Sequence, residues 1–316
     1  MTASDLQNHL ESYLELRRAT GFSMRTEERL LRDFLAFLNV DGLSESRMAQ
    51  AALEWACSRG GTGSSWQSNR LSVARCFLVH LRAHVPEVQI PSTGLIPQPM
   101  RPTPFIYSEA QTADLIKQAR CLKPEGSLRP HTYAALIGLI ASCGLRPGEA
   151  LRLNDVDVEI DRQPPRLVIR QTKFRKSRIV PVHSTTAEEL RTYAATRKRL
   201  GYDGLCEAFF VSESGAALAR STVTRNFKTI LRQAGIAGHA GGHGPNLQCL
   251  RHSFAVRRML NWYLQDVDVH VRLPHLSVYL GHAKPRHTYW YLTATPELLA
   301  GAAHRFESYV DPGGGL

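Results

Sequence analysis

The sequence predicts a mainly helical protein with a small antiparallel β-sheet, an α+β fold in two domains. Apolar side chains recur every three to four residues along most of the chain, as on one face of a helix. Two short β-branched runs, at 166–170 and 177–182, flank a polar turn and predict a hairpin. Six prolines lie within residues 86–104, and proline interrupts regular helices. This pattern divides the chain into a first domain, a linker and a second domain, over residues 1–88, 89–104 and 105–316.

The first domain is predicted to be a small helical bundle. Ser4 and Gln7 fit a capping box at the start of a first helix, which Gly21 ends. The next segment, ERLLRDFLAFL at 28–38, places four leucines and Phe34 on one helical face. Two further helices are expected on either side of the glycine-rich break RGGTGSS, at 46–58 and 65–84.

Helices and one hairpin are predicted for the second domain. A helix at 108–120 precedes a strongly apolar one, HTYAALIGLIASCG, which ends at Gly144. The hairpin strands RLVIR and SRIVPV follow, and the turn QTKFRK between them gives the hairpin a basic tip. Helices resume after the hairpin, at 185–199, 221–234, 247–264 and 295–309. The domain then ends in a short tail.

Charge is distributed unevenly along the chain. The formal net charge is +11 and the sequence pI is near 9.6. Residues 1–100 contain ten Arg, no Lys and ten Asp plus Glu, so the rest of the chain carries the whole excess. A strongly basic protein attracts polyanions, most often nucleic acid. We therefore expect the second domain to be attracted more strongly to a phosphate backbone.

Cysteine usage and hydropathy argue against several other classes of protein. The six cysteines include no CxxC pair, which disfavours a disulfide framework and a structural zinc site. His239 and His243 are four residues apart, but no cysteine or acidic cluster completes a metal-ligand set. The N-terminus lacks the apolar run of a signal peptide, and no segment approaches the roughly 20 apolar residues of a membrane span. We expect a cytoplasmic protein with no membrane contact.

Two short segments contain arginines in positions that suit a functional site. In GLRPGEALRL, Arg146 lies at a helix junction, and Glu149, three residues later, can orient it. In CLRHSFAVRRML, Arg251 and His252 lie near the start of an amphipathic helix. Each segment, taken alone, also fits a solvated basic helix face with ordinary ion pairs.

A third segment, YLGHAKPRHTYWYL, contains His282 and Tyr291 nine residues apart, a spacing that decides nothing by itself. Together, and in this order, the three segments resemble the motifs of the tyrosine recombinases, also called the phage-integrase family. The resemblance covers roughly residues 105–309. The phrase LPHLSVYLGH…TYWYLTATPELL is similar to transposon-borne members. The resemblance implies a tyrosine-recombinase-like catalytic domain preceded by a helical core-DNA-binding domain.

The resemblance implies a role for each matching residue. It makes Tyr291 the nucleophile that attacks DNA. The other catalytic positions are two arginines, a lysine at the hairpin tip and a histidine, which match Arg146, Arg251, Lys173 and His282. Three neighbours are expected to support them, namely Glu149, His252 and Tyr289, the last being seven rather than nine residues after His282. DNA-binding residues are expected around the hairpin tip, at Arg175, Lys176 and Arg178.

One catalytic position departs from the family pattern. Gln248 stands three residues before Arg251, where the family usually has histidine. Glutamine can donate a hydrogen bond to a phosphate but cannot exchange a proton near neutral pH. Three interpretations follow: Lys173 and His282 handle the protons, a nearby histidine substitutes, or the enzyme is slow or inactive. His243 and His252 are the candidates for the second interpretation.

This residue set predicts DNA cleavage without a metal ion or any other cofactor. Two permanently charged guanidiniums can bind both non-bridging oxygens of the attacked phosphate. A lysine on the hairpin tip can protonate the leaving 5′-oxygen, and family spacing favours Lys173 over Lys176. The expected activity is site-specific recombination or integration through a 3′-phosphotyrosyl intermediate, serving a mobile element.

The expected partner is double-stranded DNA, bound by a homo-oligomer, a tetramer, with or without partner recombinases. Two alternatives remain open at this stage. A type IB topoisomerase shares the chemistry but reseals the same strand, and a DNA-binding accessory protein with a weak or inactive site would also fit Gln248.

Overall fold

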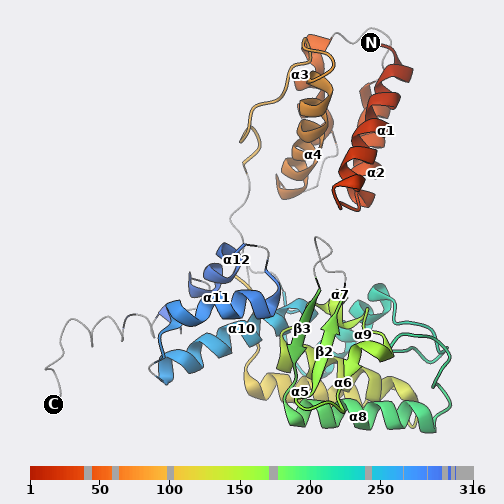
Figure 1. Cartoon of the computed structure of the whole chain (residues 1–316), viewed down its shortest axis with the longest axis vertical. Coiled ribbons are helices and arrows are strands. Elements are labelled where there is room, and N and C mark those ends of the chain that lie inside the picture. Colours follow the sequence, from red (N-terminus) through yellow and green to blue (C-terminus); the bar gives the residue numbers. More distant parts are fainter. Residues whose placement is uncertain are drawn as a thin grey trace, which may run out of the picture. The chain divides into compact units, whose positions relative to one another are not determined.

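The computed structural model describes residues 1–38, 45–58, 64–97, 103–170, 177–238, 244–265, 267–282, 284–293, 298–299 and 303. The chain divides into two compact units, Met1–Arg101 and Pro102–Leu316 (Figure 1). Each unit has an apolar core. The division falls inside the proline-rich stretch, in which Ile90 and Ile96 pack on the core of the first unit. Across the described ranges, no helix combines the length and the apolar character needed to cross a bilayer.

The first unit is a helical bundle, as expected. Its elements are α1 (Ala3–Ala19), α2 (Arg25–Leu38), the short 3₁₀ helix η1 (Glu45–Arg47), α3 (Met48–Cys57) and α4 (Ser64–Arg82). The expected start of the first helix is wrong by two residues. Thr2 caps α1 and forms a capping box with Asp5, because the Asp5 carboxylate accepts the Thr2 backbone N–H and favours the positive helix N-terminus. Gln7 instead donates to Glu11, one turn along the helix.

The second unit is built around one buried helix. Its helices are α5 (Glu109–Arg120), α6 (Leu128–Cys143), α7 (Pro147–Ala150), α8 (Ser184–Arg199), α9 (Arg220–Gln233), α10 (Leu247–Leu264), α11 (Val269–Leu280) and α12 (Arg286–Tyr289), with 3₁₀ turns η2 (Asp155–Asp157) and η3 (Trp290–Thr293). Helix α6 is buried along most of its length and packs against α5, α8 and α10. Its apolar residues therefore form the centre of the core.

The expected hairpin is present within a three-stranded antiparallel sheet of order β1-β2-β3. Its strands are β1 (Val158–Glu159), β2 (Arg166–Ile169) and β3 (Arg178–Pro181), and β1 was not expected. Leu167 pairs with Val180, and Ile169 pairs with Arg178. Side chains of alternate strand residues share a face, so Arg178 lies on the same inward face as buried Val180. The expected basic tip, with Lys173, Arg175 and Lys176, lies outside the described residues.

Helices α10 and α11 carry the later motifs. Asn246 caps α10, so Arg251 lies one turn inside the helix and is 1% exposed. The alternative in which Arg251 belongs to a solvated face is therefore wrong. Helix α11, which sequence periodicity did not indicate, is capped by Asp268 and contains Pro274 in its interior. The helix expected at 295–309 lies outside the described residues except for 298, 299 and 303, which are helical.

Gly144 ends α6 and lies two residues before Arg146. Gly144 has φ +61, and a Cβ there would overlap the Phe254 ring, whereas Gly201 has φ +79 and open space around it. We expect Gly201→Ala to cost about 1 kcal/mol of stability from backbone strain alone. Gly144→Ala should cost about 2–4 kcal/mol, because overpacking adds to the strain. Urea unfolding of both variants measures the difference, and equal losses would contradict the close approach of Phe254.

Candidate active site

Arg146 is fixed at the junction between α6 and α7. Pro147 begins α7, and Arg146 is its N-cap residue in an extended conformation. The Glu149 carboxylate accepts the Arg146 backbone N–H at 3.0 Å and Arg146 Nη1 at 2.7 Å. The backbone and the side chain of Arg146 are thus both held by one acid. The i,i+3 pair inferred from the sequence is present, but Glu149 is buried rather than solvated.

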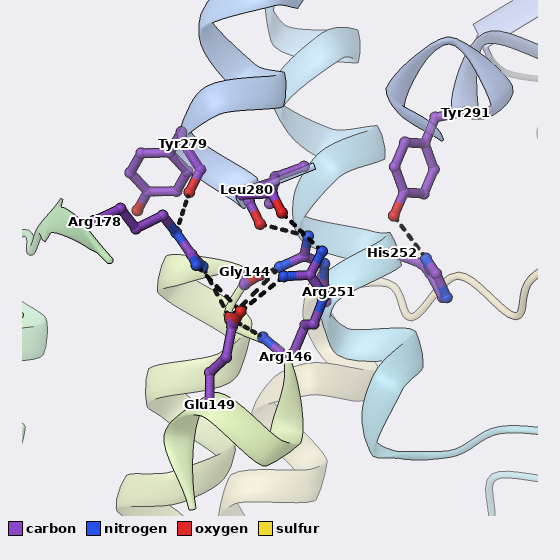
Figure 2. A network of polar contacts seen from close by, with 10 residues as sticks. Gly144, Arg146, Glu149, Arg178, Arg251, His252, Tyr279, Leu280 and Tyr291 are labelled. Atoms are coloured by element: carbon purple, nitrogen blue, oxygen red, sulfur yellow. Dashed lines mark hydrogen bonds and ion pairs between the residues drawn. The ribbon is translucent and has the colours of Figure 1, made fainter. Parts of the chain in front are cut away.

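The buried Glu149 carboxylate forms ion pairs with three guanidiniums (Figure 2). Arg178 donates through Nη1 to Oε1 at 3.1 Å and through Nη2 to Oε2 at 2.8 Å. Arg251 Nη1 lies 4.0 Å from Oε2. Burial alone would raise the pKa of Glu149, but the arginines outweigh it and hold that pKa at about 2. Glu149 is therefore ionised at every working pH, and the cluster keeps a net positive charge.

The same three arginines bind the C-terminal end of α11. Arg178 Nε donates to the carbonyl of Tyr279 at 2.9 Å. Arg251 Nη2 donates to that of Leu280 at 2.7 Å, and Arg146 Nη2 to that of Gly281 at 2.9 Å. The last carbonyls of a helix lack intrahelical partners and carry partial negative charge, so cations are favoured there. These bonds attach the end of α11 to the arginine cluster.

Gly281 allows this close attachment. It ends α11 with φ +67, and a Cβ at this position would lie 2.6 Å from Arg178 Nη1. The glycine thus meets two requirements, a left-handed backbone and room for a guanidinium. The chain then turns, and the next residue, His282, is placed beside the cluster.

Arg251 is the most deeply buried member of the cluster. Its Nη1 also donates to the Gly144 carbonyl at 2.8 Å. Burial, and then repulsion from Arg146, lower the pKa of Arg251 to about 10, while Tyr291 and Glu149 oppose that shift. The guanidinium stays charged near neutral pH. A buried cation of this kind is well suited to a phosphate, because low dielectric surroundings strengthen each charge-assisted bond.

His282 is neutral in this environment. Burial lowers its pKa to about 3, with repulsion from Arg251 and Arg146 as the next causes. Its Nδ1 lies 2.6 Å from the hydroxyl of Thr288, which is fully buried. When Nδ1 accepts the Thr288 proton, Nε2 carries the ring hydrogen and can donate it to an anion. His282 can therefore serve as a hydrogen-bond donor, whereas its low pKa disfavours it as a proton carrier.

Tyr291 lies next to the site with its hydroxyl enclosed. The side chain is 2% exposed, and its ring stacks on that of His282 at 6.4 Å between centroids. Its Oη lies 2.8 Å from Nδ1 of His252, the residue that follows Arg251 on α10 (Figure 2). Tyr289, by contrast, is 42% exposed. The structure thus places Tyr291 beside His282 and beside His252, which shares helix α10 with Arg251 of the cluster.

Other expected site residues lie differently. Gln248 is half-buried in the first turn of α10, where its backbone N–H donates to Asn246 Oδ1 at 2.9 Å. Arg178, expected to bind DNA, has its guanidinium on Glu149 and the Tyr279 carbonyl and is 13% exposed at its side chain. Its role in the cluster was missed, although its alternation with buried Val180 along β3 was an available signal. Lys173, Arg175, Lys176 and His243 lie outside the described residues.

Removing the Glu149 charge tests the cluster. We expect Glu149→Gln to lower the free energy of unfolding by about 3–5 kcal/mol, because it leaves buried guanidiniums uncompensated. The matched control is Glu188→Gln, whose carboxylate binds Arg191 at 3.1 Å but is 71% exposed. The control should lose less than about 1 kcal/mol. Urea unfolding measures both, and a small loss for Glu149→Gln would contradict its central place.

The neutral state of His282 makes stability depend on pH. Its pKa is lower in the folded state than the usual 6.5, so its contribution is present above pH 6.5 and is lost as pH falls toward about 3. Between pH 7 and 5 this loss is up to about 2 kcal/mol, reduced by partial solvent exposure of the ring. Glu149 titrates below this window, with a pKa of about 2.

The corresponding measurement compares urea unfolding at pH 7 and pH 5. His282→Asn, which keeps an acceptor near Thr288 but does not titrate, should lose less stability than the wild type over this interval. The control His275→Asn, at an exposed position on α11, should lose as much as the wild type. The same pH dependence in His282→Asn and the wild type would contradict a neutral His282.

The chain is similar to known proteins over most of its length. The family model described as the phage integrase family matches residues 109–297, more than half of the chain. A Sinorhizobium fredii protein named as an integrase/recombinase, y4rB, is 38% identical over 309 residues, covering 96% of this chain and 98% of the relative. Tyrosine recombinase XerC of Rhizobium meliloti is 28% identical over 289 residues and covers 86% of each chain.

Solved structures share the fold. The integrase of transposon Tn1549, solved with a circular intermediate DNA, aligns with a TM-score of 0.67 at 15% identity and covers 95% of this chain and 99% of that one. The family match spans α5 to η3, the elements that supply the described arginines, His282 and Tyr291. On the family match and the y4rB relative, this chain belongs to the phage integrase family and is a tyrosine recombinase.

Proposed function

We propose that Tyr291 is the nucleophile with which this recombinase cuts and rejoins DNA at specific sites. The observation that carries the proposal is the convergence of the Tyr291 hydroxyl, the His282 ring and the Arg251 helix. Attack by Oη on a phosphodiester leaves the 3′-phosphate on the tyrosine and frees a 5′-hydroxyl. A 5′-hydroxyl from another strand then displaces the tyrosine, so the bond is exchanged rather than hydrolysed.

Arg146 and Arg251 are proposed to bind the non-bridging oxygens of that phosphate. Both guanidiniums are fixed by Glu149 and by backbone carbonyls before any DNA arrives. Each guanidinium has five N–H donors, and within the described part of the chain these contacts use two of them. Preorganised donors of this kind contribute about 10²–10³ each to the rate. Arg178 is proposed to hold Glu149 and α11 in place rather than to bind DNA.

Proton transfer to the leaving 5′-oxygen is assigned to Lys173, with Lys176 of the same tip as the alternative. Both lie outside the described residues, so this assignment rests on the family resemblance. His282, being neutral, is proposed to donate a hydrogen bond to the phosphate. Gln248 is proposed to donate another from its amide. The neutral state of His282 weakens the interpretation in which it replaces the missing histidine as a proton carrier.

The proposed substrate is double-stranded DNA, in keeping with the net charge of +11. Solved relatives include XerH bound to a palindromic substrate and a lambda integrase dimer bound to a core site. By analogy we propose a homo-oligomer, a tetramer, that pairs two duplexes in the cytoplasm. The structural similarity to the Tn1549 integrase supports the proposal that this recombinase acts on the DNA of a mobile element.

Gln248 favours one second candidate, a DNA-binding accessory protein with a weak or inactive site. A type IB-like enzyme, which reseals the same strand, is the remaining alternative. Two labelled duplexes carrying the site separate the alternatives. Exchange of label supports recombination, resealing without exchange supports the type IB-like reaction, and no cleavage supports the accessory role.

A suicide duplex, nicked next to the scissile phosphate and built from the ends of the element that carries the gene, tests the nucleophile. The wild type should accumulate a covalent protein–DNA adduct, because the short cleaved fragment diffuses away. Tyr291→Phe should form none, since it lacks the attacking oxygen. Tyr289→Phe, the matched control at an exposed position, should keep the adduct. An adduct that persists in Tyr291→Phe would contradict the proposal, and gel electrophoresis measures it.

A further inference from the structure

The Tyr291 hydroxyl has a histidine as its hydrogen-bond partner. Figure 2 shows the phenol pointing toward the His252 ring, with Oη 2.8 Å from Nδ1. His252 directly follows Arg251, so the histidine and the buried arginine share one helix, α10. The contact therefore joins the proposed nucleophile to the helix that supplies a proposed phosphate-binding group.

The neighbours of His252 hold its ring in this orientation. Its centroid lies 5.9 Å from that of Trp290 and 5.5 Å from that of Tyr291. Tyr291 belongs to an apolar cluster with Phe254 and Leu280, which excludes water from the phenol. A separation of 2.8 Å inside such a cluster lies within the range in which a positioned base accepts a proton.

Two other residues near the site are less suited to accept this proton. Gln248 has an amide, which does not bind a proton near neutral pH. His282 meets the face of the Tyr291 ring, with 21° between the planes, and its Nδ1 contacts Thr288. Its pKa of about 3 also makes it a weak base. His252, in contrast, has a ring nitrogen directed at the reacting oxygen.

We propose that His252 is the general base of this recombinase. The inference rests on the proposed role of Tyr291 as nucleophile. During cleavage, Nδ1 takes the phenolic proton while Oη forms its bond to phosphorus. The bond from phosphorus to the 5′-oxygen breaks, and that oxygen takes a proton from the general acid. During religation, the 5′-hydroxyl returns its proton to that acid, and protonated His252 returns its own to the departing Tyr291.

Arg251 assists the same step. The charge of Tyr291 acts to raise the pKa of Arg251, against the burial that lowers it, so a phenolate here and the guanidinium stabilise each other. Tyrosine has an ordinary pKa near 10, about three units above neutral pH. Charge stabilisation by Arg251 and proton acceptance by His252 together reduce the free-energy cost of removing the phenolic proton during attack.

The variant His252→Asn separates proton transfer from positioning. The asparagine oxygen can still accept a hydrogen bond near the place of Nδ1, but it cannot hold the proton. We would measure single-turnover cleavage of the suicide duplex from pH 6 to 9. A second duplex has sulfur in place of the scissile 5′-oxygen, so its leaving group needs no general acid.

With both duplexes, His252→Asn should cleave about 10²–10⁴-fold more slowly than the wild type at pH 7. Its rate should rise about tenfold per pH unit as hydroxide ionises the phenol, whereas the wild-type rate should depend less steeply on pH, because His252 accepts the phenolic proton. Cleavage at the wild-type rate with the wild-type pH profile would overturn the inference and leave only a positioning role. Rescue of the variant by sulfur would also overturn it, because His252 would then act on the leaving group.

Controls separate this inference from the proposed function. His275→Asn makes the same change at an exposed position on α11 and should cleave as the wild type does. Thermal unfolding and DNA binding in a gel-shift assay test whether His252→Asn remains folded. If the wild type forms an adduct and His252→Asn is unaffected, only the inference fails. If the wild type forms no adduct through Tyr291, the proposed function fails and the inference fails with it.

Discussion

The buried carboxylate of Glu149 is the interaction on which the rest of the site depends. A single acid compensates Arg146, Arg178 and Arg251, which lie at the N-cap of α7, in β3 and in α10. Without it, three like charges would repel one another in a region of low dielectric. With it, each guanidinium also donates a hydrogen bond to a carbonyl at the C-terminal end of α11, those of Tyr279, Leu280 and Gly281. One ionised group thus joins α7, β3 and α10 and, through the arginines, the end of α11.

This arrangement explains how a site for an anion is ready before the anion binds. Backbone carbonyls and one carboxylate orient the arginines but do not neutralise all of their charge. The turn at Gly281, fixed by the same bonds, delivers His282 and then the segment that contains Tyr291. The Tyr291 hydroxyl contacts His252, the residue that follows Arg251 on α10, so the reacting oxygen is held by the helix that supplies one of the arginines. The contacts that stabilise the folded protein are therefore the same contacts that orient the site before DNA binds.

Local features of the sequence predicted helices and strands well where nearby residues alone determine the secondary structure. The helix expected at 108–120 is α5, Glu109–Arg120, because Ser108 and Gln111 form a capping box there. The hairpin followed from its β-branched residues. Helix α11 was missed because Pro274 interrupts its pattern, and the capping box of α1 was placed two residues too late. Burial of Arg251 depends on the carbonyl of Leu280 and on Glu149, and no local pattern reveals such distant partners. The contact of His252 with Tyr291 could not be predicted for the same reason, because the two residues are distant in the sequence.

A structure of the covalent complex with DNA, trapped on a suicide duplex, tests the central claim most directly. It should show phosphorus bonded to Oη of Tyr291, with non-bridging oxygens within hydrogen-bond distance of Arg146 and Arg251. Arg178 should remain on Glu149 and on the Tyr279 carbonyl, as in the protein alone. A phosphate bound away from these two arginines, or linked to any other residue, would contradict the assignment of this cluster as the catalytic centre.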